Sequence, residues 1–144
     1  MSLKKIAVGL ACAAAATALV LVPASPAAAA TTPGCLAQGS ANNLIVPVAE
    51  NNNPTCTMSM GHIRATAPVF TMQNTINVCY GTLLRQHGLA LLVVDGSWGP
   101  KTDTAFRTVQ NSIPGIAHDG IYGPQTRNNM RFISQDGVNN CLPY

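Results

Sequence analysis

Three cations and two aromatic residues near a pair of Gly-Pro dipeptides are the residues best suited to hold a ligand. The cations are Lys101, Arg127 and Arg131, which would lie in or near the first turns of two helices. Helix N-termini and Arg both match a carboxylate, because unpaired N–H groups and the guanidinium fork point at its oxygens. The aromatic residues are Trp98 and Tyr122, whose faces suit the apolar C–H faces of sugar rings. These residue types would therefore suit a ligand that carries carboxylates or sugar rings.

The same residues also have a structural interpretation. Trp98 can pack into the core beneath its loop, and Tyr122 can be half buried and still present its edge. Arg127 and Arg131 can be solvated surface charges. Both interpretations remain open from the sequence.

Catalysis would have to use His62, His87, His118, the acidic residues or the cysteines. The sequence contains no His-Glu-x-x-His or Gly-x-Ser-x-Gly pattern, and nothing marks a third group that would orient the Ser and His of residues 58–62. We therefore expect no enzymatic activity, no cofactor and no bound metal.

A short motif that occurs twice would position the candidate residues. Residues 95–102 read Asp-Gly-Ser-Trp-Gly-Pro-Lys-Thr, and residues 119–126 read Asp-Gly-Ile-Tyr-Gly-Pro-Gln-Thr. Asp-Gly makes a tight turn, and Gly-Pro begins a helix because Pro has a helical φ and needs no N–H partner. The Asp carboxylates are expected to bond their own turn amides. The residues assigned to turn structure are Asp95, Gly96, Gly99, Pro100, Asp119, Gly120, Gly123 and Pro124.

The spacing of apolar residues predicts three helices. The first covers residues 72–87, with Ile76, Tyr80 and Leu84 on one face and Gly88 as the terminating residue. The second covers residues 100–112 and the third residues 124–134, and an apolar connection over residues 89–94 leads into the first turn. The expected fold is all-α, a small three-helix bundle.

The N-terminal 30 residues have the features of a secretory signal peptide. Lys4 and Lys5 precede an apolar stretch over residues 6–22, and small residues end at Ala30, where cleavage is expected. The apolar stretch is short for a membrane span. Without this segment the net charge falls from +3 to +1, which gives no basic face for nucleic acid. We expect a secreted protein, extracellular or attached to the cell wall, with no nucleic-acid or membrane partner.

Four cysteines remain after cleavage: Cys35, Cys56, Cys79 and Cys141. An even number in an exported chain indicates two disulfides. Of the three possible pairings we favour Cys56 with Cys79 and Cys35 with Cys141, because the first closes a short loop onto a helix and the second ties the chain ends together. A zinc site is the competing interpretation, but no close Cys-x-x-Cys pair exists.

The region before the first helix is rich in Asn, Pro and Ala. We expect residues 31–68 to form an irregular, disulfide-tethered arm, in which residues 44–48 are a short strand or an apolar plug over the core. Residues 69–144 would form the domain proper.

Residues 76–132 resemble the bacterial peptidoglycan-binding domain of the three-helix type. The resemblance is carried by the two Asp-Gly-x-x-Gly-Pro-x-Thr turns, by Ala105-Phe106 with Val109-Gln110, and by Gly115-Ile116. The family's first helix usually carries Val-x-x-Leu-Gln, and the register counted back from Gly88 places Asn77, Tyr80 and Gly81 there. Arg127 stands where the family commonly has Trp. The resemblance implies a non-catalytic protein that binds peptidoglycan, through its stem peptides or its glycan.

A second function from a different class fits the same residues. The scaffold could serve as a protein-protein interaction or inhibitor module for an exported enzyme, or as an accessory to a separate wall hydrolase. The unusual arm and the missing Trp favour this alternative, whereas the turns fit either function.

Overall fold

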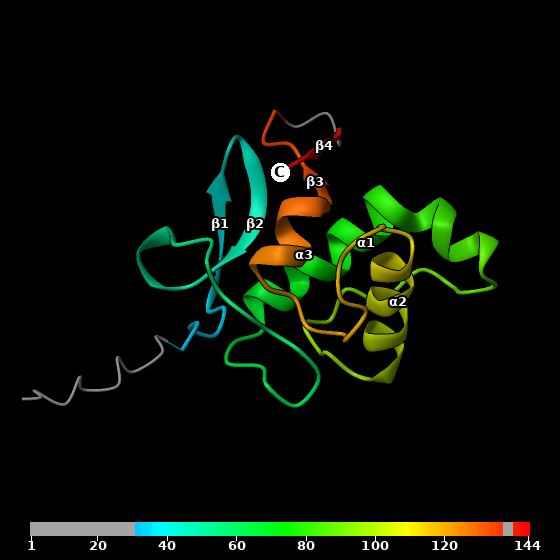
Figure 1. Cartoon of the computed structure of the whole chain (residues 1–144), viewed down its shortest axis with the longest axis horizontal. Coiled ribbons are helices and arrows are strands. Elements are labelled where there is room, and N and C mark those ends of the chain that lie inside the picture. Colours follow the sequence, from blue (N-terminus) through cyan, green and yellow to red (C-terminus); the bar gives the residue numbers. More distant parts are fainter. Residues whose placement is uncertain (1–30, 137–139) are drawn as a thin grey trace, which may run out of the picture.

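The computed structural model describes residues 31–136 and 140–144. The predicted signal peptide lies outside the described residues. The chain forms, in order, β1 (Ala37–Ala41), β2 (Leu44–Val48), the short 3-10 helix η1 (Glu50–Asn52), α1 (Ala67–Gln86), α2 (Pro100–Asn111), α3 (Pro124–Asn129), β3 (Arg131–Ile133) and β4 (Cys141–Pro143). In Figure 1 the β1–β2 hairpin lies at the left and α2 at the right, with α3 between them.

The prediction of an all-α bundle was wrong. In the part of the chain that the structure describes, three α-helices are accompanied by two antiparallel sheets of two strands each, β1 with β2 and β3 with β4, so the fold is mixed α and β. Two features of the sequence explain the difference. Asn42 and Asn43 adopt positive φ values of 53° and 61°, which is the geometry of a tight hairpin turn between β1 and β2. The third helix ends at Asn129 instead of continuing to residue 134, because residues 131–133 pair with residues 141–143.

The predicted irregular arm therefore contains regular structure. Ala41 pairs with Leu44 and Ala37 with Val48, and Leu44, Val46 and Val48 are buried. The alternative of a short strand over residues 44–48 is the one the structure adopts.

α1 is the element that organises the core. It packs against α2, β2 and β3, so strands from both ends of the chain lie on one helix. The core joins residues from the predicted arm and the predicted domain: Leu44, Val46, Val69, Met72, Ile76, Leu84, Phe106, Val109, Tyr122, Met130 and Phe132. The starts of α2 and α3 at Pro100 and Pro124 match the sequence prediction, whereas α1 begins five residues earlier than expected.

The described residues contain two disulfides, but the pairing favoured from the sequence was wrong. Cys35 bonds to Cys56 and Cys79 to Cys141, with Cα–Cα distances of 5.0 and 5.5 Å. The chain segments at Cys35 and Thr57 run side by side, since the Cys35 N–H donates to the Thr57 carbonyl at 3.0 Å. This backbone pairing brings Cys56 to Cys35. With all four sulfurs in disulfides, the zinc alternative does not apply.

Candidate functional site

Each copy of the repeated motif folds around a buried glutamine. Gln73, on α1, accepts hydrogen bonds at Oε1 from the N–H groups of Asp95 (3.1 Å) and Gly96 (2.9 Å). Its Nε2 donates to Asp95 Oδ1 (2.9 Å), the Ser97 carbonyl (2.9 Å) and Thr102 Oγ1 (3.2 Å). One side chain thus holds the turn and the start of α2 together.

Gln110, on α2, does the same for the second copy. Its Oε1 accepts from the Gly120 N–H at 2.8 Å. Its Nε2 donates to Asp119 Oδ1 (3.2 Å), the Ile121 carbonyl (3.1 Å) and Thr126 Oγ1 (3.3 Å). The repeat is therefore a repeat of structure as well as of sequence.

Both Asp residues serve their own turns, as the structural interpretation expects. Asp95 Oδ1 accepts from the Ser97 N–H and Asp119 Oδ1 from the Ile121 N–H, each at 2.8 Å. Gly96 and Gly120 adopt φ values of 73° and 74°, a backbone geometry that favours glycine. The hydrogen bonds from Gln73 and from the Ser97 N–H lower the pKa of Asp95, so this carboxylate stays ionised at neutral pH.

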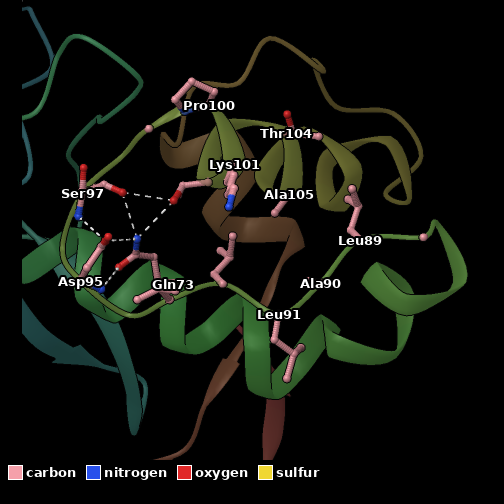
Figure 2. A pocket seen from close by; sticks show the side chains of 15 residues that line it. Gln73, Leu89, Ala90, Leu91, Asp95, Ser97, Pro100, Lys101, Thr104 and Ala105 are labelled. Atoms are coloured by element: carbon pink, nitrogen blue, oxygen red, sulfur yellow. Dashed lines mark hydrogen bonds between the residues drawn. The ribbon is translucent and has the colours of Figure 1, made fainter.

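A groove with a volume of about 760 Å³ lies beside the first turn. Figure 2 shows Lys101, Thr104 and Ala105 of α2 along one side of it, and Leu89, Ala90 and Leu91 of the preceding connection along the other. The hydrogen-bonded group of Gln73, Asp95 and Ser97 closes the end nearest the turn. The groove is therefore polar at the turn and aliphatic toward Leu89.

The connection along this groove is extended and largely exposed. The Asn77 side chain fixes it at Leu92, accepting from the Leu92 N–H and donating to the Leu92 carbonyl, both at 2.8 Å. The neighbouring backbone groups of Ala90, Leu91 and Val93 make no hydrogen bond within the described part of the chain. The side chains of Leu91 and Val93 are 49% and 77% exposed.

Of the predicted ligand-binding residues, only Lys101 lines the groove. Trp98 is 5% exposed and lies edge to face with Phe106 at a ring-centroid distance of 5.0 Å. Tyr122 is fully buried, and burial raises the pKa of its hydroxyl above the ordinary value of 10.0. Neither ring offers a face to a sugar, so the structural interpretation holds for both.

The two arginines lie apart from the groove. Arg127 is only 8% exposed, so its interpretation as a solvated charge was wrong. Its Nε and Nη2 donate to Asn128 Oδ1 at 3.0 and 2.8 Å, and its guanidinium stacks 4.4 Å from the ring centroid of Tyr144. Arg131 is exposed and donates from Nε to the Cys141 carbonyl at 3.0 Å. Of the two copies of the motif, the groove borders the first.

The sequence prediction missed Gln73 and the groove-lining connection as functional features. A signal for the glutamines exists: Val69-x-x-Met72-Gln73 on α1 and Phe106-x-x-Val109-Gln110 on α2 have the same pattern. The Val-x-x-Leu-Gln pattern of the peptidoglycan-binding domain therefore aligns with residues 69–73, where Met72 takes the place of the Leu. The register counted back from Gly88 placed it too late in the helix, because α1 is longer than predicted.

Comparison with models of known protein families, with curated proteins and with solved structures finds no match to this chain. Within residues 31–136 and 140–144, no group of three or more His, Cys, Asp or Glu side chains is arranged to hold a metal ion. In the same part of the chain, no helix combines the length and apolar character needed to cross a membrane.

Proposed function

We propose that this chain is a secreted, non-catalytic module that binds bacterial peptidoglycan. The observation that carries the proposal is the structural repeat: both copies of the motif form the same glutamine-held turn, and the first turn borders a groove with a cation at its side. The sequence of these turns is the part that resembles the peptidoglycan-binding domain. The two disulfides fit an exported protein, since such bonds persist in oxidising compartments.

The burial of the two aromatic residues of the motif favours stem peptide over glycan as the ligand. Sugar recognition commonly uses an exposed aromatic face, but both aromatic residues of the motif, Trp98 and Tyr122, are buried. Phe70 is 41% exposed but does not line the groove. Lys101, by contrast, is exposed beside the groove and suits a carboxylate. The wall polymer presents carboxylates on its stem peptides.

Co-sedimentation of residues 31–144 with purified wall sacculi tests this function. We expect the protein to pellet with sacculi and to stay in solution with cellulose and chitin. Pelleting with all three polymers would indicate a general sugar-binding surface. Failure to pellet with any of them would contradict wall binding.

A second candidate function is supported by a specific surface. Leu91, Val93 and Val94 form an exposed aliphatic stretch, which suits an interaction with another exported protein such as a wall hydrolase. Addition of the protein to wall hydrolases, with sacculus digestion as the readout, tests this candidate. A changed rate without sacculus binding would favour the interaction or inhibitor function.

A further inference from the structure

We propose that the groove beside the first turn binds the free carboxyl end of a wall stem peptide, which lies extended along residues 89–93 with its terminal carboxylate at Lys101. This inference rests on the proposed wall-binding function and names the part of the polymer that is recognised. Shape, backbone and charge support it separately.

The shape of the groove suits small aliphatic side chains. A volume of about 760 Å³ is enough for several residues of a short peptide. Leu89, Ala90, Leu91 and Ala105 line it with aliphatic groups, on which the methyl groups of a ligand can pack. Alanine residues at the end of a stem peptide meet this requirement.

The backbone of the connection offers hydrogen bonds to an extended peptide. The N–H and C=O groups of Ala90, Leu91 and Val93 are unpaired within the described residues, while Asn77 keeps the segment in place through Leu92. An exposed extended segment of this kind is a template for the addition of a further strand. Because successive residues of an extended segment point their N–H and C=O groups to opposite sides, Leu91 and Val93 share the side opposite to Leu92. A peptide laid along that side would satisfy the groups of these two residues.

The charges in the groove fix the orientation of the ligand. Lys101 is exposed and makes no ion pair with any described residue. The ion pair found among these residues joins Arg107 to Asp103. A ligand carboxylate at Lys101 would also approach the first turn of α2, a twelve-residue helix that begins at Pro100. The ionised Asp95 at the turn end repels a second carboxylate. The acid end of the ligand therefore belongs at Lys101, and the aliphatic part lies toward Leu89.

Titration of the mature protein with synthetic stem peptides tests the inference, with amide chemical shifts and calorimetry as readouts. The peptides end in alanyl-alanine with a free carboxylate, in the corresponding carboxamide, or with N-methylated alanines. We expect the free acid to shift the resonances of residues 88–94 and 100–105. The carboxamide and the Lys101→Ala variant should each bind about tenfold more weakly, as loss of a charged hydrogen bond implies. N-methylation should weaken binding by removing donors to the connection.

Matched variants and treated sacculi separate this inference from the wall-binding function. Ala90→Trp fills the groove from an exposed position, so it should abolish peptide binding without unfolding the protein. Arg131→Ala removes an exposed cation away from the groove and should leave binding unchanged.

Sacculi stripped of stem peptides by an amidase should no longer retain the parent protein. Retention on stripped sacculi, or unchanged binding by Lys101→Ala and Ala90→Trp, would overturn the inference and leave wall binding standing. Failure to bind intact sacculi would overturn both.

Discussion

Gln73 and Gln110 show why an amide side chain suits the interior of these turns. A carboxamide accepts at one atom and donates at another, and a tight turn presents N–H groups and carbonyl oxygens together. Both glutamines are buried, with 1% and 0% of their surface exposed, so water cannot replace their hydrogen bonds. Each glutamine therefore stabilises the turn that follows it, and Gln73 also shapes the end of the groove.

Gln73→Leu should destabilise the protein strongly. The substitution keeps the side-chain size but leaves the buried Gly96 N–H and the Thr102 hydroxyl without this partner. We expect a loss of about 3 kcal/mol in the free energy of unfolding, measured by urea denaturation with the disulfides intact. Gln86→Ala is the matched control, because Gln86 is exposed on the same helix. A loss below about 0.5 kcal/mol for Gln73→Leu, similar to a neutral surface substitution, would contradict this role.

Tyr122 and Tyr80 form a natural pair for a second test. The Tyr122 hydroxyl is buried with no hydrogen-bond partner among the described residues, whereas the Tyr80 hydroxyl accepts from the Arg131 N–H at 2.6 Å. Tyr122→Phe should therefore leave stability unchanged or raise it by up to about 1 kcal/mol, and Tyr80→Phe should lower it by about 1 kcal/mol. Equal losses for both variants in urea denaturation would contradict this assignment.

Tyr122 and Tyr80 also predict how the free energy of unfolding changes at alkaline pH. Burial raises the pKa of Tyr122 above its ordinary value of 10.0, so the folded protein holds a proton that the unfolded chain releases. The stability linked to neutral Tyr122 is complete below the unfolded pKa and falls as the pH rises through it. Tyr122→Phe should therefore lose less stability than the parent between about pH 8 and pH 11. Because burial also raises the pKa of Tyr80, a smaller alkaline loss should remain.

At the scale of elements, the sequence predicted those that have strong local signals. Pro100 and Pro124 begin helices because the signal lies in the residues themselves, and Gly88 follows α1 with a φ of 71°. The sequence did not predict the β1–β2 hairpin, although Asn42-Asn43 forms its turn. Asn-Gly is a stronger signal for such a turn, and the two strands are short. β3 could not be predicted locally, since its partner β4 is distant in the sequence. The groove was missed for a similar reason: it forms only when the connection, α1 and α2 come together.

The two disulfides should contribute unequally to stability. Cys35–Cys56 closes a separation of 21 residues and joins two loop segments, whereas Cys79–Cys141 closes 62 residues and joins α1 to β4. Loop-closure entropy predicts a loss of about 3 kcal/mol for the first and about 4 kcal/mol for the second when each pair is replaced by alanine. Urea denaturation of the two double variants measures the difference. Peptide mapping of the parent under non-reducing conditions checks the pairing, and a Cys56–Cys79 peptide would contradict it.

At the scale of the whole molecule, the predicted arm and the predicted domain share one core. Leu44, Val46 and Val48 of β2 pack on α1 and β3, and Met58 pairs through its backbone with Tyr122. The Leu44 backbone also pairs with Ser134. The sequence suggested a boundary between residues 68 and 69 because the composition changes there. Composition does not show that the strands before this boundary pack on the helix after it. The region before α1 is thus a structural part of the fold that carries the groove.

Residues 69–144 alone should therefore fail to fold cooperatively. The fragment keeps the Cys79–Cys141 pair, α2, α3, β3–β4 and all of α1 except Ala67 and Pro68, so a loss of cooperativity reflects the missing region before residue 69. Leu44, Val46 and Val48 each contribute about 2 kcal/mol by burial, and a domain of this size has a total stability of about 5–15 kcal/mol. The fragment also lacks Met58, whose backbone pairs with that of the buried Tyr122, and β2, which packs on β3. We expect a broad thermal transition and poorly dispersed amide resonances for the fragment, against a sharp transition for residues 31–144. A cooperative transition in the fragment would show instead that the hairpin is an appendage, and that the groove could be presented without it.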